Sequence, residues 1–121
     1  MATVINRDDL RSILRDWIAG RLSSTQVHEW AEARYATHTF EAEDDVVNVV
    51  LSDLDMLDLN LRTAEDVPIL LQVLDYSDSQ LEEACALLDR HTGSIDLDAR
   101  KRMLKGDPLY RHVLGKPDEA V

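Results

Sequence analysis

The chain has 121 residues, of which 45% are hydrophobic and 31% are charged, and its formal net charge is −11. This size and composition favour one globular domain over a disordered chain or two domains. The strong negative charge repels nucleic acid and anionic membranes and attracts basic protein surfaces. The chain has no apolar signal segment, no run of the ~18 apolar residues that a membrane span needs, and no cysteine besides Cys85. We therefore expect a cytoplasmic protein without nucleic-acid or membrane partners.

The first two helices are indicated by their capping residues. Asn6 suits an N-cap, apolar residues then recur at helical spacing over 10–18, and Gly20 suits the left-handed end of that helix. Ser23 followed three residues later by Gln26 is typical of a capping box, which predicts a second helix to about Ala36. Residues 37–40 show no periodicity, and we expect a loop there.

The third helix has the strongest pattern. Its apolar residues are spaced three or four apart from Val47 to Leu61, which predicts one helix through Leu61. At about 100° per residue, the apolar arc covers more than half of the helix perimeter. A helix of this kind lies in the middle of a bundle and touches several neighbours. Its polar residues form one narrow stripe of Glu41, Asp44, Asp45, Asn48, Ser52 and Asp55.

The fourth and fifth helices are shorter. Thr63 and Asp66 have capping-box spacing and predict the start of the fourth helix. Apolar residues at helical spacing over 81–88 mark the fifth, and Gly93 suits its C-terminal cap.

Two short C-terminal helices complete the prediction. Asp96 caps the first, which Gly106 stops, and Asp107 followed by Pro108 begins the second, which runs through Leu114. The sequence thus predicts an all-α fold. It is a single-domain helical bundle over residues 1–115, with about five main helices plus one or two short C-terminal helices, and a flexible tail over 116–121.

The charge is unevenly distributed along the chain. Residues 41–66 contain nine acidic residues against Arg62, whereas residues 100–116 contain six basic residues against Asp107. We expect the basic segment to pair mainly with the acidic helices of the same chain rather than with nucleic acid.

The sequence shows no pattern typical of a catalytic or metal site. A calcium loop that began at Asp53 would need glycine at its sixth position and glutamate at its twelfth, where Asp58 and Ala64 stand. The four histidines lack zinc-site spacing, and Cys85 falls on an apolar helix face. We therefore expect no enzyme activity, no catalytic residue, no cofactor and no metal ligand.

Asp53 is unusual because it falls within the apolar arc of the third helix. A buried carboxylate is costly unless it is paired. We expect an internal ion pair with an arginine such as Arg11, Arg15 or Arg34. Two alternatives stay open: the helix ends earlier, or Asp53 contacts another chain.

The stretch Leu14–Val27, with Trp17, Gly20 and Ser23, is followed by the acidic helix. This order resembles the opening of small acidic bacterial immunity proteins of the colicin D immunity type. The resemblance covers about a quarter of the chain. It implies a helical cytoplasmic protein that binds a basic nuclease toxin, with carboxylates in the toxin's RNA-binding cleft. The candidate partner-binding residues are the exposed acids Glu41, Asp44, Asp45, Asp55, Glu65 and Asp66.

Two other interpretations stay open. In the first, the chain is a homodimer or larger homo-oligomer with a structural or regulatory role. Part of the wide apolar arc would then be an interface, and residues 41–66 of one copy would meet residues 100–116 of another. Alternatively, the acids around Asp53, Asp55 and Asp58 form a metal-assisted catalytic site of unrecognised type.

Overall fold

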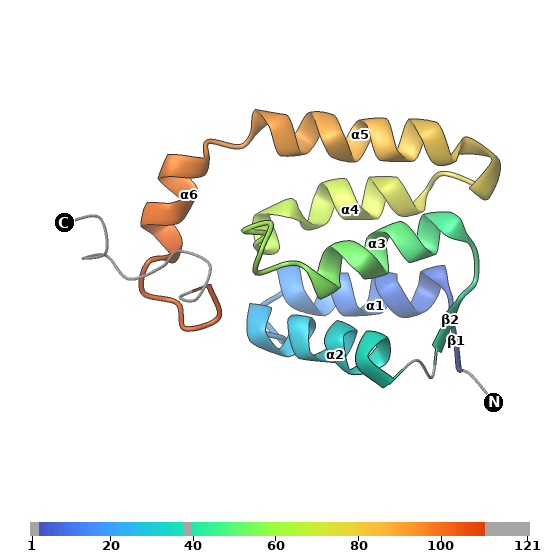
Figure 1. The fold of residues 1–121 in the computed structure, drawn as a ribbon, viewed down its shortest axis with the longest axis horizontal. Helices are drawn as coiled ribbons and strands as arrows, with labels where there is room; N and C mark the ends of the chain where they lie inside the picture. Colours follow the sequence, from blue (N-terminus) through green and yellow to red (C-terminus); the bar gives the residue numbers. More distant parts are fainter. Residues whose placement is uncertain (1–2, 38–39, 111–121) are drawn as a thin grey trace.

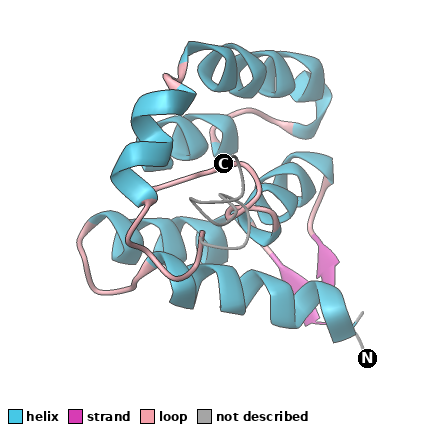
Figure 2. Cartoon of the chain, turned by 60° about the vertical axis from the view of Figure 1, so that its left-hand side comes forward, coloured by secondary structure: helices cyan, strands magenta, loops and turns pink. Residues whose placement is uncertain are grey.

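The structure is a computed structural model that describes residues 3–37 and 40–110. In this part of the chain the fold is all-α, with a small two-stranded sheet beside the bundle (Figure 2). The helices are α1 (Arg7–Ile18), α2 (Ser24–Thr37), α3 (Asp45–Asp55), α4 (Val67–Leu74), α5 (Leu81–Ser94) and α6 (Leu97–Leu104). The strands are β1 (Thr3–Ile5) and β2 (Phe40–Ala42), and single 3-10 turns, Ala64–Asp66 and Asp78–Gln80, precede α4 and α5.

Consecutive helices run in opposite directions. As a result, α1, α3 and α5 begin at one end of the molecule, and α2 and α4 begin at the other (Figure 1). The short helix α6 lies at the end where α5 finishes, away from the starts of α1, α3 and α5 (Figure 1).

The capping residues set the helix starts as predicted. Asn6 and Asp9 exchange hydrogen bonds of 2.9 and 3.0 Å in a capping box, and Gly20 after α1 has φ 81°. Ser23 and Gln26 form a second box at the start of α2. Asp96 accepts the Ala99 N–H at 3.0 Å and caps α6. Each of these motifs is local in sequence, because a cap bonds only to the first turn of its own helix.

The strand pair was not predicted. Phe40 lies in the expected loop 37–40, yet Phe40–Ala42 pairs in parallel with Thr3–Ile5, and Ile5 carbonyl accepts the Glu43 N–H at 2.8 Å. Strands of three residues are too short to show an alternating pattern. The pairing places the start of α3 beside the start of α1.

The third helix is shorter than predicted. It ends at Asp55, and the chain turns back over residues 56–61, where Leu61 has φ 54°. Leu57 and Leu61 are buried nonetheless, so the apolar spacing continues without a helix. A left-handed backbone costs a leucine energy, and the packing of Leu61 in the core offsets this cost.

Helix α3 lies in the middle of the bundle and contacts α1, α2, α4 and α5. The apolar residues of its broad arc are largely covered by these neighbours, since Val46, Val47, Val50, Leu51 and Leu54 are all fully buried. The wide apolar arc is therefore core, and the expectation that part of it forms an interface with another chain is wrong for these residues.

The C-terminal part differs from the prediction in two places. Gly93 lies inside α5, which continues to Ser94, and it does not adopt a left-handed cap. The expected last helix from Asp107 is a single turn over residues 107–110, and its remainder lies outside the described residues, as does the predicted tail 116–121. Within the described residues, no helix has the length and apolar character to cross a membrane.

Tyr110 anchors this C-terminal turn. Its side chain is fully buried, and its hydroxyl donates to the carbonyl of Arg62. Burial raises the pKa of the Tyr110 phenol to about 12. The turn therefore closes over the segment between α3 and α4.

We expect the Tyr110→Phe variant to lose less stability than the wild type when the pH rises from 10 to 12. Because the folded pKa is about 12 against an ordinary value of 10.0, the phenol contributes fully below pH 10, and its contribution is lost as the pH rises through 12. The difference in unfolding free energy between the two proteins should change by about 2–3 kcal/mol over this range. Urea unfolding at pH 9 and pH 12 measures it, and an equal loss in both proteins would contradict the assignment.

Candidate functional site

Exposed carboxylates gather where α1, α3 and α5 begin, and we call this surface the acidic end. Its members come from four stretches of the chain, residues 8–9, 41–45, 75–78 and 82–83, that the fold brings together (Figure 1). Acids are favourable there because the N-terminus of a helix carries partial positive charge. The exposed acidic residues are Asp8, Asp9, Glu41, Glu43, Asp45, Asp75, Asp78, Glu82 and Glu83.

Hydrogen bonds join these segments to one another. The carboxylate of Asp78 before α5 accepts the Asp45 N–H of α3 at 3.0 Å, and the Glu43 carboxylate accepts the Arg7 N–H at 3.2 Å. The acidic end is thus a joined surface rather than a set of independent loops.

Two arginines of α1 cross-link this end to the last turn of α4. Arg7 Nη1 lies 2.6 Å from Asp44 Oδ2, and its other nitrogens donate to the carbonyls of Leu74 and Tyr76 at 3.0 and 2.8 Å. Arg11 Nη2 lies 3.2 Å from Asp75 Oδ1 and 3.3 Å from the Leu74 carbonyl. The carbonyls at the end of α4 therefore bind guanidinium groups, as expected for a helix C-terminus.

Asp44 is a structural residue of this end. It accepts the Val47 N–H at 2.9 Å and caps α3. Burial opposes its ionised form, but the bond from Val47 and the contact with Arg7 together lower the pKa of the Asp44 carboxyl. Asp44 is consequently held ionised by its own chain and is only partly accessible to a partner.

The structure separates the six predicted partner-binding residues. Glu41 and Asp45 are exposed at the acidic end, and Asp44 lies beneath them. Asp55 is half-buried at the far end of α3, where burial raises the pKa of its carboxyl. Glu65 and Asp66 lie just before α4, at the opposite end of the bundle, so the six do not form one surface (Figure 1).

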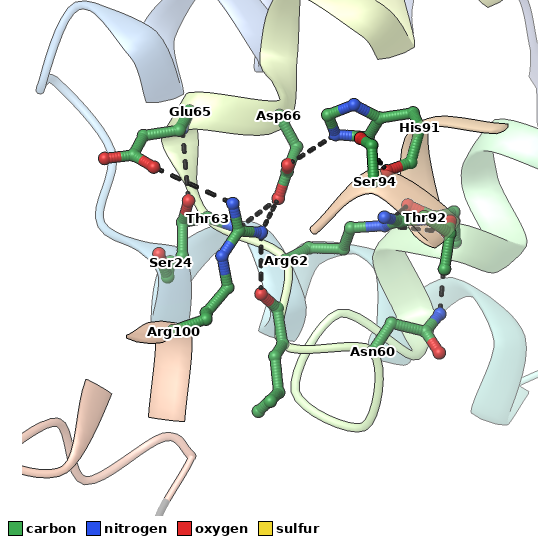
Figure 3. A network of polar contacts seen from close by, with 12 residues as sticks. Ser24, Asn60, Arg62, Thr63, Glu65, Asp66, His91, Thr92, Ser94 and Arg100 are labelled. Carbon is green, nitrogen blue, oxygen red and sulfur yellow. Dashed lines mark hydrogen bonds and ion pairs between the residues drawn. The ribbon is translucent and has the colours of Figure 1, made fainter. Parts of the chain in front are cut away.

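Asp66 is fully buried, so the expectation that it is exposed is wrong. Its Oδ2 accepts the Thr63 N–H at 2.8 Å and lies 2.7 Å from Arg100 Nη1, and its Oδ1 lies 2.7 Å from His91 Nε2 (Figure 3). Arg100 also donates to the Leu61 carbonyl at 3.1 Å. Asp66 thus joins the start of α4 to the end of α5 and to α6, and the expected pairing of the basic segment with its own chain is confirmed for Arg100.

Asp53 is buried and paired, as expected, but its partner is Arg62 and not one of the three arginines named from the sequence. Arg62 Nε and Nη2 lie 3.0 and 3.1 Å from the two Asp53 oxygens, and Nη2 also donates to Thr92 at 2.8 Å. The early end of α3 makes this pair, because the turn over 56–61 brings Arg62 back over the helix. Burial raises the pKa of the Asp53 carboxyl despite the attraction of Arg62.

Most acids of the acidic end are absent from the six predicted partner-binding residues. Those not predicted are Asp8, Asp9, Glu43, Asp75, Asp78, Glu82 and Glu83. In an antiparallel bundle, however, alternate helices begin at the same end, so the acids before and inside the first turns of the first, third and fifth helices were a usable signal.

The described residues include no group of three or more His, Cys, Asp or Glu side chains arranged to hold a metal ion. The Cys85 thiol is half-buried and makes no disulfide. Comparisons of the chain with family models, curated proteins and solved structures give no match.

Proposed function

We propose that this chain is an acidic protein-binding module that docks a basic protein through its acidic end. The proposal is supported by one observation above all: exposed carboxylates from four stretches of the chain converge at one end of a cross-linked bundle. Pre-positioned carboxylates attract a basic surface from a distance and reduce the ordering cost of binding. The colicin D immunity resemblance suggests the kind of partner, a basic nuclease toxin that is inhibited by stoichiometric binding in the cytoplasm.

The test is a pull-down at low and high salt with two matched variants of equal charge. One variant, Glu41→Gln/Glu82→Gln/Glu83→Gln, neutralises three exposed acids of the acidic end. The control, Glu29→Gln/Asp89→Asn/Asp98→Asn, neutralises three exposed acids elsewhere.

We expect the wild type and the control to capture one basic protein and to hold it at about 0.3 M salt, where surface charges are strongly screened. The acidic-end variant should lose it. Equal losses from both variants would mean that capture reflects net charge alone, and the proposal would fail.

A head-to-tail homo-oligomer is the second candidate, and one observation favours it. The exposed Lys101, Arg102 and Lys105 lie on or just after α6, at the opposite end of the molecule from the acidic end (Figure 1). Helix α6 also exposes Leu97 and Met103. A contact between unlike ends would repeat from copy to copy. Sedimentation over a range of protein and salt concentrations distinguishes this candidate, since its mass would grow with concentration at low salt.

A further inference from the structure

A hollow of about 340 Å³ opens between α4 and α5 at the acidic end, lined by Gln72, Asp75, Tyr76, Gln80 and Leu87. Its volume is near the lower limit of the roughly 300–1,000 Å³ that ligand pockets occupy, which suits one side chain of a partner rather than a large ligand. No sequence pattern indicates this hollow, and the contacts that hold the bundle together do not explain it.

The lining combines three kinds of group. Tyr76 and Leu87 are half-buried and supply aromatic and aliphatic surface. Gln72 and Gln80 are exposed and supply amide groups, and Asp75 supplies a carboxylate whose side chain is 72% exposed. A lining that contains both an aromatic ring and a carboxylate favours a planar cation, because such a cation can stack on the ring and donate hydrogen bonds to the acid.

The residues at the end of α4 already bind guanidinium groups of the same chain. On the side of α4 that faces α1, the guanidinium groups of Arg7 and Arg11 donate to the carbonyls of Leu74 and Tyr76. The hollow is lined by Asp75 and Tyr76 of the same turn, together with Leu87 of α5. Arg11 contacts Oδ1 of Asp75, but a carboxylate accepts bonds from more than one guanidinium.

We propose that the α4–α5 hollow receives the guanidinium of an arginine on the basic partner, stacked on Tyr76 and hydrogen-bonded to Asp75. This inference rests on the proposed function, and it names one anchoring contact within that interface. It also predicts a preference for arginine over lysine, since an ammonium group neither stacks nor forms a two-pronged bond as guanidinium does.

The experiment compares fluorescein-labelled hexa-arginine and hexa-lysine peptides by fluorescence anisotropy at about 50 mM salt, where charge attraction is still strong. Asp75→Asn is matched with Glu83→Gln, which removes one exposed charge of the acidic end outside the lining of the hollow. Tyr76→Ala is matched with Tyr76→Phe, which keeps the ring. Urea unfolding of each variant verifies that it is folded.

We expect hexa-arginine to bind the wild type several-fold more tightly than hexa-lysine. Tyr76→Ala should weaken hexa-arginine binding by about fivefold, the loss typical of a cation–π contact, while Tyr76→Phe retains most of the affinity. Asp75→Asn should weaken it more than Glu83→Gln does.

Two outcomes would overturn the inference, and they differ in what they leave standing. If both peptides bind equally well and the Tyr76 and Asp75 variants match their controls, the acidic end attracts basic chains but the hollow takes no arginine. If neither peptide binds, the inference and the proposed function fail together.

Discussion

Replacing Asp66 by alanine is expected to lower the free energy of unfolding by about 3–5 kcal/mol, the usual cost of removing one partner of a buried charged network. The change would remove the acceptor that the guanidinium of Arg100, the His91 ring and the Thr63 N–H share, although Arg100 would keep its bond to the Leu61 carbonyl. Because small domains are stable by only about 5–15 kcal/mol, this loss would be a large fraction of the total stability.

Urea unfolding at pH 7 measures this loss, with Glu65→Ala as the matched control. Glu65 precedes Asp66 in the chain, and its side chain is 69% exposed. The Glu65 carboxylate lies 3.7 Å from Arg100 Nη2, so the control should lose at most about 1 kcal/mol, the upper range for an exposed ion pair. Similar losses in both variants would contradict the central role of Asp66.

The second large effect concerns the buried Asp53–Arg62 pair. Asp53→Ala should cost about 3–5 kcal/mol, because it leaves a buried guanidinium uncompensated. Asp53→Leu should also be destabilising, since an arginine partner is present. By contrast, the double replacement Asp53→Leu/Arg62→Met should restore stability close to that of the wild type.

Two features of the Asp53–Arg62 pair support the expected recovery of stability in the double variant. Burial raises the pKa of the Asp53 carboxyl, so desolvation outweighs the attraction of Arg62. Arg62 Nη1 is buried and has no hydrogen-bond partner among the described residues. Urea midpoints of the wild type, Asp53→Leu, Arg62→Met and the double variant form a complete cycle. A double variant as unstable as Asp53→Ala would show that the ion pair itself stabilises the fold.

The helix starts could be predicted because their causes are local. Asn6, Ser23 and Asp96 each bond within three residues, so a short stretch of sequence contains the whole motif. The order of helices in an antiparallel bundle follows from short connections between amphipathic segments.

The end of α3 and the role of Asp66 could not be predicted in the same way. Apolar spacing continues through Leu57 and Leu61 although the helix has ended, and only the packing of the turn distinguishes the two structures. The partners of Asp66 come from 25 and 34 residues further along the chain. Its position at the end of a capping box did carry one signal, because such an acid turns back toward the backbone and not out to solvent.

These separations in sequence also determine the order in which the contacts can form during synthesis. Tyr110 follows Arg62 by 48 residues, and Arg100 follows Asp66 by 34. At roughly 5–20 residues per second, a growing chain presents the turn between α3 and α4 for several seconds before its C-terminal partners exist. Through that interval the nascent bundle is held by its apolar core and by earlier polar contacts such as Arg7–Asp44, and the contacts from Arg100 and Tyr110 can form only later.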